Sequence, residues 1–368
     1  MQNKEFGSNF CEELEVSPLF LNDSNSRLFF DSGRSALRFL LNQIGRKISK
    51  VLLPEYICDS VILPFLECEH QIVYYPVDKF FKIKKEAFID TVTSEKPQLI
   101  FVQTYFGIDT FAELKTYLEE LREKDIFIIE DITHSLFSKH IWLDRGADYM
   151  IGSLRKWCSI PDGGILIVKS QKGKRLINTI PLEENVNFVQ MRLEAQKEKR
   201  QYLKLNNNKI EKKRFIQLYD SSEKLLNLES KYYTMSQYTR ARINSINYIE
   251  LVKSRQSNFL ELKYRLKDIP IIKVLDLEHE KNVVPLYCPI YVYGNIRNTL
   301  RLNLQDKNIL LPVIWPKSNY LPVKVSNEVD WIYSHILAIP CDQRYRSEDL
   351  KEVVEEIKNI INNLMEKK

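Results

Sequence analysis

The feature that most constrains the fold of this chain is an alternation, through its first two thirds, of short apolar runs with longer amphipathic stretches. The runs are rich in Val, Ile, Leu and aromatic residues, which is typical of strands buried on both faces. The stretches between them carry apolar residues at helical spacing. This alternation predicts an α/β fold, with helices covering a mostly parallel sheet. The expected strands are residues 50–54, 71–77, 99–103, 126–131, 149–153 and 165–169.

The last part of the chain has a different pattern. From about residue 183 long polar-apolar helical stretches replace the alternation, and residues 236–266 predict mostly one helix with at most one break. We therefore predict a large α/β domain with linking helices over residues 1–230 and a small α+β domain over residues 231–368. Further elements are expected at 35–44, 58–67 and 111–124 (helices), 283–292 and 309–315 (strands), and 295–304 and 348–365 (helices).

The composition argues against several classes of protein. Basic residues number 54 and acidic residues 49, so the net charge of +5 is too small to indicate a nucleic-acid binder. No apolar run approaches the roughly 18 residues that cross a bilayer, and the first residues lack a signal-peptide pattern, so we expect a cytoplasmic protein without a membrane partner. The six cysteines form no CxxC pair and the histidines no HExxH, which argues against disulfides and metal sites. GxGxxG and Walker-type loops are absent as well.

Residues 197–214 concentrate positive charge, with eight Lys or Arg against two Glu. A solvated helix and loop is the ordinary interpretation. The alternative is a patch that contacts an anionic ligand such as a diphosphate.

Three polar clusters fall at predicted strand ends or helix starts. The first is Asp31-Ser32-Gly33-Arg34, directly before a helix. Backbone N–H groups at a helix start, with a glycine that permits close approach, can bind a phosphate. A Ser-Gly pair is also an ordinary helix cap.

The second cluster follows the strand at 126–131. Glu130 and Asp131 emerge at its carboxyl end, and His134 lies one helical turn later. A carboxylate there can hold a cationic group, although a solvated strand end with a packed histidine has the same appearance.

The third cluster contains Ser153 and Lys156, between two strands and before a Gly-Gly turn. A lysine in this position can form a covalent bond to an aldehyde, although surface lysines are commoner. The three clusters together match the needs of pyridoxal 5'-phosphate: a phosphate site, then Asp131 for the ring nitrogen, then Lys156 for the aldehyde.

These segments resemble a known family. SGRSALRFLL, VLLPEYICDSVILPFLE, LIFVQTYFGIDT, IIEDITHS and SLRKWCSIPDGGILIV are similar to the corresponding segments of the DegT/DnrJ/StrS-type nucleotide-sugar aminotransferases. The resemblance extends over nearly the whole chain. It implies a fold-type I architecture, with a mostly parallel, seven-stranded type of sheet and a smaller C-terminal domain.

The resemblance also implies roles for individual residues. Lys156 would bond the cofactor, Asp131 would hold its ring nitrogen and His134 its phenolic oxygen, while Gly33 and Ser153 would contact its phosphate.

The chain departs from the family at several points. The segment before Lys156 is shorter, the asparagine that reaches a neighbouring subunit's phosphate is not visible around residues 232–238, and two single residues differ. The first of these residues is Arg34, where the family has a small hydroxyl residue in the phosphate loop. The second is Cys58, where the family places an aromatic residue over the ring; Tyr56 is a nearby substitute.

The implied activity is transfer of an amino group, from L-glutamate by family analogy, to a ketosugar carried on a nucleotide diphosphate. Such products belong to surface-polysaccharide or other glycan biosynthesis, and the family implies a homodimer. Two alternatives stay open: another fold-type I sugar enzyme such as a dehydratase or lyase, and a non-catalytic homologue. Lys156 argues against the dehydratase relatives, which have histidine at that position. The sequence does not identify the sugar or the carbon that is aminated.

Overall fold

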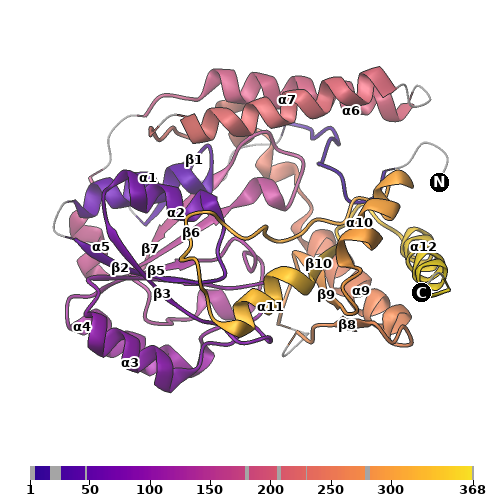
Figure 1. Cartoon of the computed structure of the whole chain (residues 1–368). Helices are drawn as coiled ribbons and strands as arrows, with labels where there is room; N and C mark the ends of the chain where they lie inside the picture. The colour runs from indigo at the N-terminus through magenta and orange to yellow at the C-terminus, as the bar shows by residue number, and fades with distance from the viewer. Residues whose placement is uncertain are drawn as a thin grey trace.

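The computed structural model describes residues 5–16, 26–45, 48–178, 182–204, 209–228, 230–277 and 282–366. Within these ranges the chain forms two sheets and a helical hairpin (Figure 1). The larger sheet has seven strands in the order β1-β7-β6-β5-β4-β2-β3. Its strands are β1 (Arg27–Phe30), β2 (Lys50–Pro54), β3 (Gln71–Tyr75), β4 (Leu99–Gln103), β5 (Phe127–Asp131), β6 (Tyr149–Ser153) and β7 (Gly164–Val168).

This sheet confirms the predicted mostly parallel architecture. The five strands from β3 to β6 run parallel, whereas β7 and the edge strand β1 are antiparallel to their neighbours. Every residue of β4, β6 and β7 is buried, which explains their continuous apolar sequences. In Figure 1, α1 and α2 lie on one side of the sheet, with α3 and α4 on the other. The helices are α1 (Gly33–Ile44), α2 (Asp59–Glu67), α3 (Lys85–Glu95), α4 (Lys115–Glu123) and α5 (Gln171–Leu176), with 3₁₀ turns η1 (Ala112–Leu114), η2 (Lys139–Trp142) and η3 (Leu154–Lys156).

The smaller sheet is antiparallel, in the order β10-β9-β8, and lies in the C-terminal part. The terminal helix α12 packs against α9 and α10, and its buried residues recur at intervals of three and four, including Leu350, Val353 and Ile357. A boundary between the two parts at residue 230 stays a prediction. The C-terminal elements are β8 (Ile272–Val274), β9 (Tyr287–Val292), β10 (Ile336–Pro340), α9 (Tyr248–Leu266), α10 (Arg297–Asp306), α11 (Asn327–His335) and α12 (Ser347–Met365).

Two long helices, α6 (Val186–Lys204) and α7 (Lys209–Leu228), form a hairpin along one side of the molecule (Figure 1). Tyr202 of α6 packs against Phe215 of α7, with ring centroids 5.3 Å apart. None of the described helices is long and apolar enough to cross a membrane.

The prediction of mostly one helix with at most one break over residues 236–266 is wrong, because the stretch is broken twice. The structure has α8 (Gln237–Arg240), η4 (Ile243–Ser245) and then α9. Ser236 caps the start of α8 by accepting the Thr239 N–H, and Asn247 starts a new helix, α9, by accepting the Glu250 N–H. The apolar spacing continues through both caps, so periodicity alone could not find them.

The expected strand over residues 309–315 is also wrong. Ile309 makes only an isolated bridge with Phe6, and the chain then continues as an irregular segment up to α11. The short elements β1, β8, α3 and α11 were not expected from the sequence.

Candidate active site

A pocket forms where neighbouring parallel strands end. Gln103, Asp131 and Ser153 are the last residues of β4, β5 and β6, and all three line it. The start of α1 and the η3 turn complete its walls. Of the eight residues predicted for the site, six line this one pocket: Gly33, Arg34, Cys58, Asp131, Ser153 and Lys156.

The start of α1 is built for close approach. Ser32 caps the helix, and its side chain accepts the Ser35 N–H at 3.1 Å. A Cβ on Gly33 would lie 3.3 Å from the Gly152 carbonyl oxygen, and one on Gly164 would lie 2.1 Å from the Ser32 carbonyl oxygen. Glycine at position 164 is therefore required for the first turn of α1 to reach the end of β7. The N–H groups in the first turn of a helix lack intrahelical partners, so this turn can bind an anion.

Asp131 provides a buried negative charge. Its Oδ1 accepts the Thr133 N–H at 2.8 Å. Burial raises the pKa of this carboxyl group, while hydrogen bonds from Thr133 and the charge of Lys156 act in the opposite direction. A cationic group bound beside Asp131 would offset the cost of burying its charge.

Lys156 is the last residue of η3, directly after β6, and is half-buried at the pocket wall. Its neighbour Trp157 fixes this segment, because the fully buried indole donates its Nε1–H to the Thr133 carbonyl oxygen at 2.8 Å. The Gly163 N–H donates to the Asp31 carbonyl oxygen at 2.6 Å. These bonds connect the three sequence clusters into one unit.

Two predicted residues, Tyr56 and His134, do not line this pocket. Both pack against Trp315, which itself lines the pocket. The Trp315 ring centroid lies 5.5 Å from that of Tyr56 and 5.2 Å from that of His134. The Phe106 N–H donates to His134 Nδ1 at 3.4 Å, and burial lowers the pKa of this histidine well below its usual value, so the ring is neutral. The Tyr56 hydroxyl has no hydrogen-bond partner among the described residues. Contacts of these two with a cofactor stay predictions.

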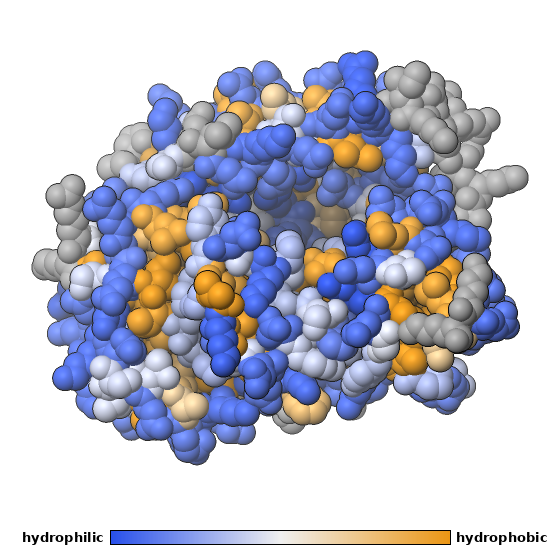
Figure 2. Space-filling model, in the orientation of Figure 1, coloured by the Kyte–Doolittle hydropathy of each residue, from blue (hydrophilic) through white to orange (hydrophobic). Residues whose placement is uncertain are grey.

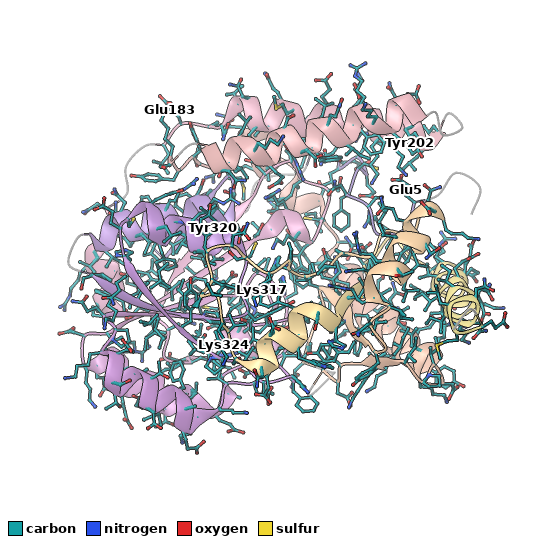
Figure 3. The ribbon with its side chains drawn as sticks, viewed as in Figure 1. Glu5, Glu183, Tyr202, Lys317, Tyr320 and Lys324 are labelled. Carbon is teal, nitrogen blue, oxygen red and sulfur yellow. The ribbon has the colours of Figure 1, made fainter. Side chains whose placement is uncertain are left out.

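Sequence reasoning missed Gln103 and Trp315. Gln103 could have been predicted, because it is a polar residue at the end of an apolar run. In the structure it pairs in register with Asp131. Trp315 had no such signal, since it reaches the pocket from the irregular segment between α10 and α11. Figure 3 labels Lys317, Tyr320 and Lys324 on this segment, which runs across the large sheet.

That segment is attached to the large sheet at two points. The Tyr74 hydroxyl donates to the Tyr320 carbonyl oxygen at 3.3 Å, and the Ser326 N–H donates to Glu55 Oε2 at 3.0 Å. These attachments lie on either side of the exposed side chain of Val323 and fix the course of the chain beyond Trp315.

The basic stretch 197–214 makes contacts within the chain. Lys199 donates to Ser8 Oγ at 2.7 Å, and Arg200 donates to the Cys11 carbonyl oxygen at 2.8 Å. Lys212 pairs with Glu5 at 2.7 Å, which lies near the Tyr202 end of α6 in Figure 3. Residues 205–208 and the Lys209 side chain lie outside the described residues.

These contacts hold the N-terminal segment, residues 5–16, against the hairpin. They give part of the stretch a structural role, whereas the ordinary interpretation had it solvated. Contact of the rest with a diphosphate stays a prediction.

Comparison with known proteins identifies the fold. No protein-family model matches the sequence, and no curated protein is significantly similar to it. Solved structures do match: Helicobacter pylori PseC, an aminotransferase involved in the biosynthesis of pseudoaminic acid, is 13% identical with a TM-score of 0.69, covering 98% of this chain and 100% of PseC. A DegT/DnrJ/EryC1/StrS aminotransferase from Brucella abortus is 15% identical with a TM-score of 0.64, covering 90% of this chain and 85% of that one. The chain has the fold of these sugar aminotransferases.

Two further matches carry ligands. NtdA from Bacillus subtilis, with the cofactor PMP bound, is 14% identical with a TM-score of 0.64, covering 91% of this chain and 73% of NtdA. DesI, determined in the presence of its TDP-sugar product, is 12% identical with a TM-score of 0.64, covering 93% of this chain and 83% of DesI. At these identities the likeness establishes the fold-type I architecture, and the activity has to be argued from the pocket.

Proposed function

We propose that this protein is a pyridoxal-phosphate-dependent aminotransferase that transfers an amino group to a ketosugar carried on a nucleotide diphosphate. One observation carries the proposal. Segments around residues 33, 58, 131 and 156 are far apart in the sequence, yet they line one pocket that contains both Asp131 and Lys156. The resemblance assigns all four segments to the cofactor.

The residues of this pocket fit pyridoxal phosphate. Gly33 and Arg34 present the first turn of α1, and the buried Arg34 Nε has no hydrogen-bond partner among the described residues, so it is free to meet an anion. Ser153 adds a hydroxyl group beside them. Asp131 offers a buried carboxylate to a protonated ring nitrogen, and Lys156 offers an amine to an aldehyde.

The chemistry then follows from the placement of charge. Bound pyridoxal phosphate supplies an aldehyde carbon that carries the amino group and a ring that accepts electrons from the α-carbon of the donor. Asp131 keeps a proton at the ring nitrogen, and the low-dielectric surroundings strengthen that interaction. The donor's amino group would first displace Lys156 from the aldehyde carbon. The freed Lys156 Nζ would then move the proton from the donor's α-carbon to that former aldehyde carbon, where the amino group remains.

The amino donor and the acceptor are proposed from the family resemblance. We infer L-glutamate as donor from that resemblance alone. We infer a nucleotide-diphosphate ketosugar as acceptor because PseC takes part in the biosynthesis of pseudoaminic acid and DesI has a TDP-sugar product. The proposal includes the homodimer and the cytoplasmic location expected from the sequence. The reaction would serve surface-polysaccharide or other glycan biosynthesis.

An absorption spectrum tests the proposal directly. The purified protein with pyridoxal phosphate should show the band of a lysine-bound cofactor, and L-glutamate should remove that band as the amino group is transferred. Borohydride should trap the cofactor on Lys156, as located by mass spectrometry. A protein that binds no cofactor would be the non-catalytic homologue, and one that binds it but ignores amino donors would favour the dehydratase or lyase.

A further inference from the structure

A second cavity adjoins the cofactor pocket. It has a volume of about 270 Å³, and Arg155 and Lys156 line both spaces. Its remaining walls come from three distant parts of the chain: residues 7–10, the α6–α7 hairpin, and the C-terminal part from α9 to the loop after β10. We call it the arginine cavity. Figure 2 shows that this face of the molecule is hollowed below the hairpin.

The arginine cavity has an excess of positive charge. Five cationic side chains line it, against two carboxylates, so the balance is 5 − 2 = +3. The cationic residues are Arg155, Lys156, Arg192, Arg255 and Arg344, and the carboxylates belong to Glu223 and Asp342.

The two carboxylates are already engaged. Asp342 forms a two-bond pair with Arg344, at 2.8 and 2.9 Å. Glu223 is shared, because Arg155 contacts both of its oxygens and Arg192 contacts one at 3.3 Å. Arg255 therefore has no carboxylate within ion-pair distance among the described residues, and Arg192 shares Glu223 with Arg155.

These two arginines are also the most deeply buried of the set. Arg192 is 7% exposed and Arg255 1% exposed. The Nε of each has no hydrogen-bond partner among the described residues, and the Nη atoms of Arg255 donate only to carbonyl oxygens. Burial, and then the charge of Arg155, lower the pKa of Arg192 to about 10, so it is still charged at neutral pH. Buried charges normally have a charged partner, so the unpaired Arg255, beside an Arg192 that shares Glu223 with Arg155, indicates a bound anion.

We propose that the arginine cavity binds a small dicarboxylate, the amino donor or its keto-acid product, with Arg192 and Arg255 as its carboxylate-binding residues. The proposal rests on the proposed function for the identity of the reaction and names the residues that select the donor. Arginine matches the planar geometry of a carboxylate. The volume lies below the range of roughly 300–1,000 Å³ typical of drug-sized ligands, which favours a five-carbon acid over a whole sugar nucleotide.

The hairpin has a specific part in this arrangement. It supplies Arg192 from α6, and Glu223 from α7 holds that arginine beside Arg155. Arg155, the residue before Lys156, thus forms an ion pair with the hairpin. Glu223 is a positioning residue, whereas Arg192 would touch the donor.

Calorimetric titration of the pyridoxal-phosphate-loaded protein with glutarate tests the proposal. Glutarate has two carboxylates and no amine, so it can bind but cannot react. We expect Arg192→Gln to weaken glutarate binding at least tenfold, Arg192→Lys to weaken it less, and the exposed control Arg214→Gln to leave it unchanged. Butyrate, with a single carboxylate, should bind at least tenfold more weakly than glutarate to the wild type. The melting temperature verifies the fold, and Arg192→Lys keeps the test valid if the Gln variant does not fold.

Thymidine diphosphate is the second arm of the experiment. It should not compete with glutarate, and Arg192→Gln should not change its affinity. Competition, together with an equal loss in the variant, would assign the cavity to the diphosphate and overturn the proposal, as would unchanged glutarate binding in Arg192→Gln. Glutarate binding can also be measured without cofactor, so a failure to trap pyridoxal phosphate on Lys156 would refute the proposed function without affecting this result.

Discussion

The cofactor pocket and the arginine cavity share Lys156 but are built in different ways. Most walls of the cofactor pocket are strand ends of one sheet and the segments that follow those strands, so the strand order itself brings them together. The walls of the arginine cavity come from the N-terminal segment, the hairpin and the C-terminal part, which no single element connects. The comparison teaches that chemistry common to a fold can reside in its sheet, while the choice of substrate resides in segments added around it.

Replacing Lys156 should have the largest effect. Lys156→Ala removes the amine that bonds the cofactor and moves the proton, so turnover should fall by several orders of magnitude and borohydride should trap no adduct. The exposed Lys174→Ala is a matched control and should behave like wild type. A reduced adduct found on another lysine would refute the assignment of Lys156.

Asp131→Asn should separate function from stability. A neutral amide cannot hold the ring proton, so the half-reaction with L-glutamate should slow by about a thousandfold, or about 4 kcal/mol. Burial raises the pKa of Asp131, so the cofactor-free variant should melt at the same temperature as wild type or higher. Rates within tenfold of wild type would show that another group partners the ring.

Glu130, the neighbour of Asp131 on β5, is not among the residues that line the cofactor pocket. Replacing it therefore tests the stability of the large sheet separately from the site. Its oxygens make no hydrogen bond within the described residues, and Arg145 Nε lies 3.8 Å from Oε1. Burial raises its pKa to about 7, so between pH 4.5 and 7 the folded state holds a proton that the unfolded state releases. Its contribution to stability therefore falls as pH rises through that window.

Glu130→Gln should remove this dependence. At pH 8 the variant should be more stable than wild type by up to about 3 kcal/mol, and at pH 4 the two should be similar. Urea unfolding at several pH values measures the difference, with the exposed Glu123→Gln as control. Parallel curves for wild type and variant would mean that Glu130 is already ionised in the folded protein.

Lys199→Met should have the smallest effect and act on the arginine cavity alone. It removes the bonds from Nζ to Ser8 and Asn9, which line that cavity. We expect the KM for L-glutamate to rise about tenfold, or about 1.4 kcal/mol, with the KM for the sugar nucleotide and the trapped cofactor unchanged. Lys204→Met, exposed on the same helix, is the control. An equal loss in both half-reactions would indicate a general folding defect.

The same contrast explains what the sequence could predict. The strands that end at Gln103, Asp131 and Ser153 are buried on both faces, so each appears as an unbroken apolar run followed by a polar residue. Local sequence therefore indicated both the sheet and the edge where the site lies. Within the pocket, the Lys156 and Asp131 segments could be recognised because each is contiguous.

What the sequence could not predict depends on contacts between distant segments. Residues 309–315 are apolar and were expected to pair as a strand, but the structure uses them to carry Trp315 to the cofactor pocket. Arg192 is one basic residue on a polar helix, and its importance comes from Glu223 on the next helix and Arg155 beside Lys156. No local sequence pattern indicates that these three side chains contact one another. For the same reason the charge of residues 197–214 suggested a ligand patch, although much of it holds residues 5–16.

The attachment of the N-terminal segment has a consequence for how the chain is made. The Gly7 N–H donates to the Tyr345 hydroxyl at 2.7 Å across 338 residues of sequence, and Arg344 donates to the Ser8 carbonyl oxygen. At about 5–20 residues per second, a ribosome needs roughly 20–70 s to make the intervening chain. The strands of the large sheet, which end at Val168, can assemble during that time. Residues 7 and 8 therefore reach their final places long after they are made, and the arginine cavity closes only after residues 344 and 345 have left the ribosome.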